Sequence, residues 1–182
     1  MSLSRFLYPL DEFYAQANRG LPAVELVSGE DVPEPYKSLL LHSNDMTPAL
    51  EKYHGETLHL KILNRQQRDD AYFREVVLAT DETGNPVEDG AIKINLLLFP
   101  PNARLQILQE RLPLGHILAE LKILHRSRPE VYLKVTSDPF IDSALGLPPS
   151  STVYGRRNVL LDPDQRSLAE VVEILPLSLD QQ

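Results

Sequence analysis

Residues 71–99 read AYFREVVLATDETGNPVEDGAIKINLLLF, and this stretch decides the fold. Two segments, AYFREVVLAT at 71–80 and AIKINLLLF at 91–99, read as strands, and the polar sequence DETGNP lies between them. Gly84 and Asn85 readily adopt positive φ, which a tight reversal of the chain requires. The stretch therefore predicts an antiparallel hairpin.

Other parts of the chain add strands to the same sheet. Alternate residues are apolar in ETLHLKIL at 56–63, which predicts a half-buried strand. RPEVYLKVTSD at 128–138 reads as a further extended segment, and residues 153–175 read as two strands around a turn of the type Asp-Pro-Asp. By contrast, RQQRDD at 65–70 reads as a polar break between strands, and residues 139–152 read as a loop.

Three segments carry helix signals. PYKSLLLHS at 35–43 predicts a short helix. NDMTPALEKYHG predicts a second helix, with Thr47 as its N-cap, Pro48 at the first helical position and Gly55 as its end. LPLGHILAELKIL at 112–124 places its leucine and isoleucine side chains on one face at helical spacing. Strands grouped in hairpins with a few helices predict an α+β fold, an antiparallel sheet covered by helices.

Composition limits the function classes. The chain has 182 residues, which predicts a single domain over 1–182, and its formal net charge of −8 argues against nucleic-acid binding. It has no cysteine and its five histidines lack the spacing of a metal site, so we expect no metal. The start of the chain resembles no signal peptide and no segment is long enough for a membrane span, which predicts a cytoplasmic protein.

Several charged residues fall within the predicted strands. Arg74, Lys93 and Arg157 each share a strand face with apolar residues, and so does Glu173. An ionised group on such a face must be paired or must meet a ligand, because burying it alone costs several kcal/mol. These residues are therefore either structural ion pairs or parts of a pocket in which arginines bind a carboxylated small molecule.

Two adjacent arginines in VYGRRNVLL, at 153–161, must have different roles. Their side chains point to opposite faces of the sheet. Arg157 shares its face with Val153, Val159 and Leu161, so we expect it to be buried against a carboxylate partner or aimed into a ligand cavity. Arg156 then becomes the structural or rim residue.

Over residues 36–176 the chain resembles the chorismate pyruvate-lyase family, in its divergent bacterial and archaeal branch. The stretches that carry the resemblance are, in order, LLLHSNDMTPALE, YFREVVLATDETGNPVEDG, LPLGHIL, VYGRRNVLL and EVVEILP. The resemblance implies a chorismate lyase-like fold, in which helices and helical flaps close a twisted antiparallel sheet over an internal ligand site. It also implies an enzyme, a carbon–oxygen lyase that cleaves chorismate to 4-hydroxybenzoate and pyruvate without metal or organic cofactor. The family supplies precursors for quinones such as ubiquinone or plastoquinone.

The resemblance also assigns roles to individual residues. It implies that Arg74 binds a ligand carboxylate and that Glu173 assists the elimination, with Glu170 as the alternative if the register differs. Met46, in the flap, and Leu114 and Gly115, in the PLG segment, would border the substrate. The family arginine that directly follows the glycine corresponding to Gly90 is Ala91 here. We therefore expect Lys93, Arg156 or Arg157 to supply the second cation.

A second function comes from a different class. The same fold serves as the small-molecule-sensing half of some bacterial transcription regulators, behind a winged-helix DNA-binding domain. The first 35 residues are too few for such a domain, which favours the enzyme. A non-catalytic domain that binds or senses an aromatic acid is the alternative.

Overall fold

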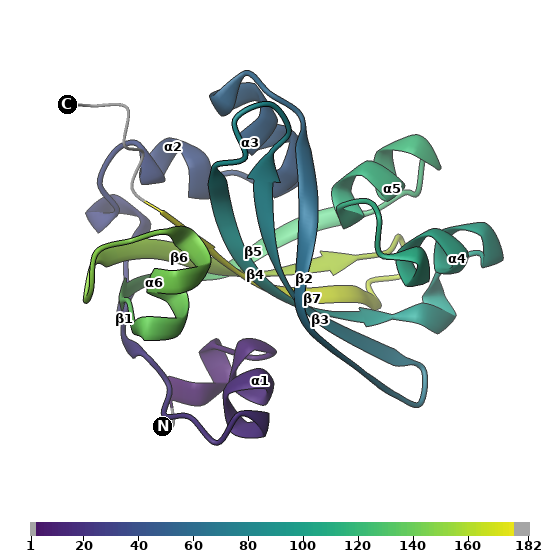
Figure 1. The fold of residues 1–182 in the computed structure, drawn as a ribbon. Coiled ribbons are helices and arrows are strands. Elements are labelled where there is room, and N and C mark those ends of the chain that lie inside the picture. Colours follow the sequence, from purple (N-terminus) through teal and green to yellow (C-terminus); the bar gives the residue numbers. More distant parts are fainter. Residues whose placement is uncertain (1–2, 177–182) are drawn as a thin grey trace.

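The computed structural model describes residues 3–176, and its centre is one seven-stranded sheet in which every neighbouring pair is antiparallel (Figure 1). The strand order is β1-β5-β6-β7-β4-β3-β2. The sheet thus consists of two meanders, β2-β3-β4 and β5-β6-β7, joined where β4 pairs with β7, and of β1, which is added beside β5. The strands are β1 (Ala23–Val27), β2 (Leu58–Arg68), β3 (Ala71–Thr80), β4 (Pro86–Asn95), β5 (Arg126–Thr136), β6 (Thr152–Leu161) and β7 (Ser167–Leu175).

The predicted hairpin is confirmed. Strands β3 and β4 pair from Ala71 opposite Asn95 to Ala79 opposite Pro86, with a shift of register between Leu78 and Ala79, and Gly84 in the turn has a φ of 70°. The polar break at 65–70 was wrong, because β2 continues to Arg68 and reverses at Asp69, whose φ is 51°. Strand pairing with β3 stabilises this polar segment in an extended form that its own composition does not favour.

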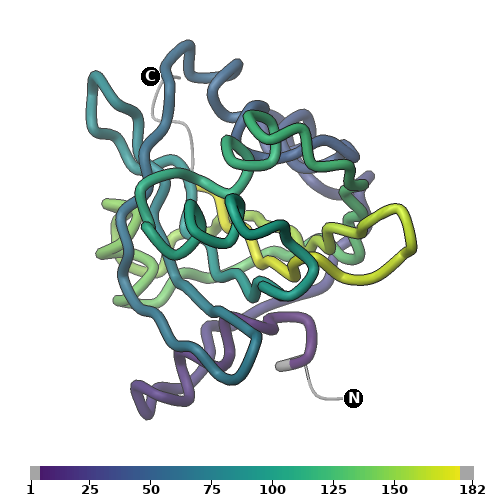
Figure 2. Tube along the Cα trace, turned by 90° about the vertical axis from the view of Figure 1, so that its right-hand side faces the viewer, coloured from purple at the N-terminus to yellow at the C-terminus, as the bar shows by residue number. Residues whose placement is uncertain are grey.

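Helices cover both faces of the sheet (Figures 1 and 2). One face carries α2 (Tyr36–Leu40), α3 (Met46–His54), α4 (Pro101–Gln109) and α5 (Leu114–Glu120), which bury side chains against β3, β4, β6 and β7. The opposite face is covered by the N-terminal η1 (Leu3–Phe6) and α1 (Leu10–Gln16) and by α6 (Pro139–Leu145). Short 3-10 turns, η2 (Gly29–Asp31) and η3 (Leu96–Leu98), complete the chain.

Alternation along each inner strand assigns every residue to one of these faces. In β3, Arg74, Val76 and Leu78 point toward the α3 and α5 side, which we call the cavity face. Rows of residues cross the sheet in register on this face. One such row runs Arg156, Glu173, Gly90, Val76, and the next runs Asn158, Val171, Ile92, Arg74.

Three elements were not predicted. Strand β1 pairs with β5 at the edge of the sheet, helix α4 follows Pro100, and the segment expected to be a loop contains α6. For α6 the signals were present in the sequence: the Asp138 side chain accepts hydrogen bonds from the backbone N–H groups of Phe140 and Ile141, and Gly146 ends the helix with a φ of 65°. Helix α3 starts two residues earlier than expected, so Asp45 and not Thr47 holds the N-cap position.

The α+β fold with a central antiparallel sheet and covering helices is confirmed. The single domain expected over 1–182 stays a prediction, and its ends, residues 1–2 and 177–182, lie outside the described residues. Within the described chain, none of the helices combines the length and the apolar character needed to cross a membrane.

Candidate ligand-binding site

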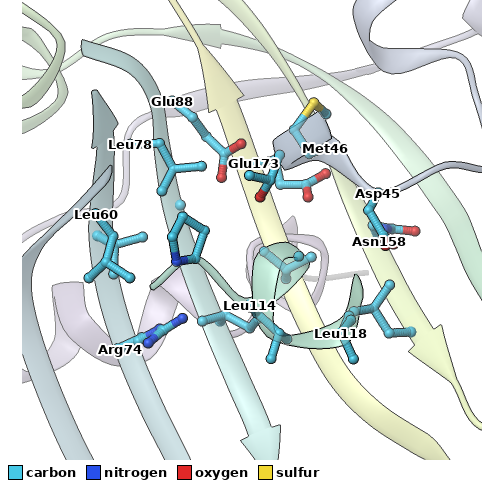
Figure 3. Close-up of a pocket in the computed structure, with 18 residues that line it drawn as sticks. Asp45, Met46, Leu60, Arg74, Leu78, Glu88, Leu114, Leu118, Asn158 and Glu173 are labelled. Atoms are coloured by element: carbon cyan, nitrogen blue, oxygen red, sulfur yellow. The ribbon is translucent and has the colours of Figure 1, made fainter. Parts of the chain in front are cut away.

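A cavity lies between the cavity face of the sheet and the helices α3 and α5 (Figure 3). All of its space that is free of protein atoms, including the mouth, amounts to about 600 Å³. The space in which the centre of a water molecule can lie is about 70 Å³. Because one water needs about 10–15 Å³ of the latter space, the cavity has room for several waters or one compact organic molecule. Most of its wall is apolar: Met46, Leu60, Val76, Leu78, Ile92, Pro113, Leu114, Leu118, Leu160 and Val171.

One end of the cavity holds Arg74, a buried and poorly paired cation. Its side chain is 2% exposed, and its Nη2 donates only a long hydrogen bond of 3.5 Å to the carbonyl oxygen of Leu112. Nε and Nη1 find no hydrogen-bond acceptor among the described residues. Burial lowers the pKa of Arg74, and the nearby Tyr72 and Glu110 oppose that shift. The guanidinium therefore offers the N–H groups of Nε and Nη1 to a ligand.

The other end holds two carboxyl groups, those of Glu88 and Glu173 (Figure 3). Glu173 accepts a hydrogen bond of 2.5 Å from Nε of Arg156, whose side chain is fully buried. Glu88 is 5% exposed, and its Oε2 has no partner in the part of the chain that the structure describes. Burial raises the pKa of Glu88 well above its usual value, and the charge of Glu173 adds to the shift while Arg156 opposes it.

Gly90 allows this placement of Glu88. A Cβ atom at Gly90 would lie 2.7 Å from Oε1 of Glu88, closer than real Cβ contacts allow. The glycine thus leaves the space in which the Glu88 carboxyl folds back over β4, into the row that contains Glu173.

The roof of the cavity is formed by α3 and α5, which pack closely because of Gly115. A Cβ atom at this glycine would lie 2.9 Å from the Oγ1 atom of Thr47. Two histidine contacts hold the roof: His116 Nε2 lies 2.7 Å from Glu51, and His125 Nε2 lies 2.8 Å from Asp45. The hydrogen bond to Asp45 raises the pKa of His125.

Five of the predicted site residues line this cavity together: Met46, Arg74, Leu114, Gly115 and Glu173. They come from α3, β3, α5 and β7, elements far apart in the sequence. Their functional roles stay predictions. The register alternative, Glu170, points to the opposite face of the sheet and binds Lys93 and Arg157.

Lys93 and Arg157 do not line the cavity, which corrects their expected placement. Lys93 contacts Glu170 at 3.4 Å and lies 5.5 Å from the ring centroid of Tyr8. Arg157 donates hydrogen bonds to Glu170 and to the carbonyl oxygen of Tyr8, at 2.6 and 3.2 Å, and also pairs with Glu130. Both residues occupy the alternate positions of their strands and therefore face away from Gly90 and Glu173.

Arg156, expected to be a structural or rim residue, is the buried arginine of the pair. Alternation with valine and leucine did not distinguish the two arginines, because β6 is covered on both faces and apolar residues alternate on each. Arg156 binds Glu173 and also donates to the carbonyl oxygens of Leu40, His42 and Asn44, at 3.1, 2.8 and 3.3 Å. It is the second cation near the cavity, and its partners belong to the protein.

Glu88 was missed by sequence reasoning, although a signal for it was present. In β4 it alternates with Gly90, Ile92 and Ile94, so it is a charged residue on an otherwise apolar strand face. No group of three or more potential metal ligands occurs among residues 3–176.

Among the solved structures similar to this chain are a ligand-binding domain of a transcription regulator and an effector domain. The chain is similar to the ligand-binding domain of a protein assigned to the GntR family of transcriptional regulators from Bordetella bronchiseptica, with 14% identity, a TM-score of 0.52, and coverage of 66% of this chain and 86% of that one. It is also similar to the effector domain of PhnF from Mycobacterium smegmatis, with 15% identity, a TM-score of 0.56, and coverage of 76% and 91%. It spans 65% of the longer PhnF chain, with 16% identity, a TM-score of 0.57 and coverage of 75% of its own length. No family model matches the chain, and no curated protein matches it in sequence.

These similarities establish the fold, which is the chorismate lyase-like fold that the ligand-binding domains share. They also correct the expectation that the chain is an enzyme. The structures named above are a regulator's ligand-binding domain and an effector domain, so the predicted carbon–oxygen lyase activity was wrong. Chorismate cleavage to 4-hydroxybenzoate and pyruvate, and a place in quinone biosynthesis, have no support here.

Proposed function

We propose that this chain is a small-molecule-binding domain that senses a compact organic acid, with the acid group bound by Arg74. The unpaired, buried guanidinium of Arg74 carries the proposal. A buried cation without a partner costs several kcal/mol, so a protein that keeps one gains most when a ligand anion supplies the missing contacts. The similarity to effector domains of regulators supports the same class of function.

The chemistry of the walls narrows the ligand class. Guanidinium groups bind carboxylates through two parallel hydrogen bonds, and Nη1 and Nη2 of Arg74 can form such a pair, because Nη1 has no acceptor among the described residues and Nη2 donates only a long bond of 3.5 Å. The apolar wall formed by leucine, isoleucine and valine side chains favours a ligand with an apolar body, such as an aromatic ring. We therefore favour an aromatic acid, and we infer that Met46, Leu114 and Gly115 contact its body.

Removal of the Arg74 guanidinium is expected to abolish recognition of the acid. Calorimetric titration should show that benzoate, 4-hydroxybenzoate or a related acid binds the native chain, whereas the matched amides do not. In Arg74→Met the affinity should fall by about 30-fold or more, because truncating one partner of a buried charge pair costs about 2–5 kcal/mol. Arg74→Lys should recover only part of it, since lysine lacks the planar fork.

A matched control is available in Arg128→Met, because the Arg128 side chain is 51% exposed on the edge-side strand β5. This variant should bind like the native protein. Equal affinity for an acid and its amide, or an Arg74→Met variant that binds as tightly as the native chain, would show that Arg74 is not the anion site.

The same substitution should stabilise the ligand-free protein. Methionine fills much of the space of the arginine and removes an unpaired buried charge, so we expect Arg74→Met to raise the free energy of unfolding by about 1–2 kcal/mol. Urea unfolding without ligand measures this change. A loss of stability would mean that the guanidinium is satisfied in the empty protein, and the argument from its missing partners would fail.

A further inference from the structure

The two ends of the cavity differ in charge. Arg74 supplies one positive charge at its end, and no ion pair within the described chain compensates it. At the other end, Glu88 and Glu173 share one cation, Arg156. Arg156 makes its hydrogen bonds to Glu173 and to three backbone carbonyl oxygens, so Glu88 is left with an oxygen that has no donor.

Acidic and basic ends face the same apolar space (Figure 3). The Glu88 carboxyl folds over Gly90, and Gly90 lies in the row of Val76, two residues along β3 from Arg74. Two residues of strand span about 7 Å, so this is the approximate separation along the strand between the anion site and the carboxyl pair. A para-substituted benzene ring or a short aliphatic chain separates its two end groups by a similar length.

We propose that the ligand is a zwitterion, with its acid group on Arg74 and an ammonium or similar cationic group between Glu88 and Glu173. This inference rests on the proposed function and names the ligand more closely. Each free group in the cavity then gains the partner that it lacks: the Arg74 N–H donors receive an anion, and the unpaired oxygen of Glu88 receives a charged donor. An acid that carries no cationic group would leave the unpaired oxygen of Glu88 without a charged donor.

Glu88 has one other way to exist in the cavity, which is to hold a proton. Burial raises its pKa, so an empty cavity accommodates the neutral acid form. A cationic group on the ligand competes with that proton for the Glu88 carboxylate. A buried carboxylate binds such a cationic group more tightly than it binds an uncharged hydrogen-bond donor. If Glu88 only holds its proton, a charged group on the ligand gains nothing at this end.

The test compares pairs of ligands that differ only in this group. The probes are 4-(aminomethyl)benzoate against 4-ethylbenzoate and, for a flexible body, 6-aminohexanoate against heptanoate. Calorimetric titration near neutral pH should show that at least one ammonium acid binds about 10-fold or more tightly than its neutral partner, as expected for a hydrogen bond to a charged group. In Glu88→Gln the ratio should fall to about 1, because the ammonium acid loses its carboxylate partner.

Glu82→Gln is the control for loss of charge, because Glu82 is exposed in the turn after β3, and it should leave the ratio unchanged. Glu88→Leu gives a second variant of the same position that does not depend on an amide. If the acids without an ammonium group bind through Arg74 as tightly as the ammonium acids, the proposal of a zwitterionic ligand is wrong. The proposal that Arg74 binds an acid group then still holds. If none of the acids binds, both proposals fall.

Discussion

Replacing Arg156 with methionine is expected to lower the free energy of unfolding by about 3–5 kcal/mol, the cost of breaking a buried ion pair from one side. Its side chain is fully buried, and the Glu173 side chain is 7% exposed. Without the guanidinium, Glu173 would keep a buried charge beside Glu88, and the carbonyl oxygens of Leu40, His42 and Asn44 would lose their donor. Urea unfolding followed by circular dichroism measures the loss.

Arg157→Met is the matched control, the same change one residue further along β6. The Arg157 side chain is 13% exposed and its glutamate partners are 31% and 21% exposed, so its ion pairs are more hydrated and we expect a loss of about 1 kcal/mol. Joint replacement of Arg156 and Glu173 by methionine and leucine should recover part of the stability lost in the single variant. Equal losses in Arg156→Met and Arg157→Met would contradict the assignment of Arg156 as the buried anchor.

Arg156 also connects the carboxyl end of the cavity to the chain segment that leads into its roof. One end of its guanidinium group binds Glu173 at the cavity, and the other binds the backbone at 40–44, the segment between α2 and α3. Helix α3 follows this segment directly and forms half of the roof. The residues that shape the carboxyl end of the cavity are thus the same residues that position its roof.

Much of the sheet could be predicted from the sequence because the signals are local. The turn around Gly84, the alternation in 56–63 and the reversal after Leu161 each depend on a few adjacent residues. Strand β1 and the polar half of β2 could not be predicted in this way. Their extended form is stabilised by hydrogen bonds to β5 and β3, partners that lie far away in the chain.

The cavity was only partly predictable for a similar reason. Alternation places Arg74 on one face of its strand, but it does not say which of two covered faces contains a cavity. Lys93 and Arg157 also alternate with apolar residues in their strands, but they form ion pairs with Glu170 on the opposite face. Glu88 matters because Gly90 leaves room beneath its carboxyl, and that relation appears only when the side chains are placed in three dimensions.

The predicted lyase illustrates a different limit. The sequence resemblance led to the right fold, and the fold is shared by proteins with different functions. The residues carried over by motif, Arg74 and Glu173, line the cavity as expected, yet their placement does not distinguish catalysis from binding. The proposed site includes a further charged residue, Glu88, which the resemblance did not mark.

Asp89→Asn is expected to stabilise the protein by about 2 kcal/mol or more at pH 8 and to have little effect at pH 4, because it removes a carboxyl that the fold buries without a partner. Asp89 lies in β4 on the face covered by α1 and α6 and is 1% exposed. Neither carboxylate oxygen has a hydrogen-bond partner in the described part of the chain. Burial raises the pKa of Asp89 well above its usual value, and the charges of Glu75 and Asp138 add to the shift.

The direction of the pH effect follows from these shifts. Because the folded protein keeps protons that the unfolded chain releases above about pH 4, the stability present below that pH is lost as the pH rises toward the folded-state pKa. Each such group contributes a slope of up to about 1.4 kcal/mol per pH unit, and burial raises the pKa of Glu75 and Glu88 as well. Urea unfolding between pH 4 and 8 should therefore give a shallower decline for Asp89→Asn than for the native chain. Asp164→Asn, at a side chain that is 76% exposed, should leave the decline unchanged, and an Asp89 variant with the native slope would show that this carboxyl is ionised in the folded protein.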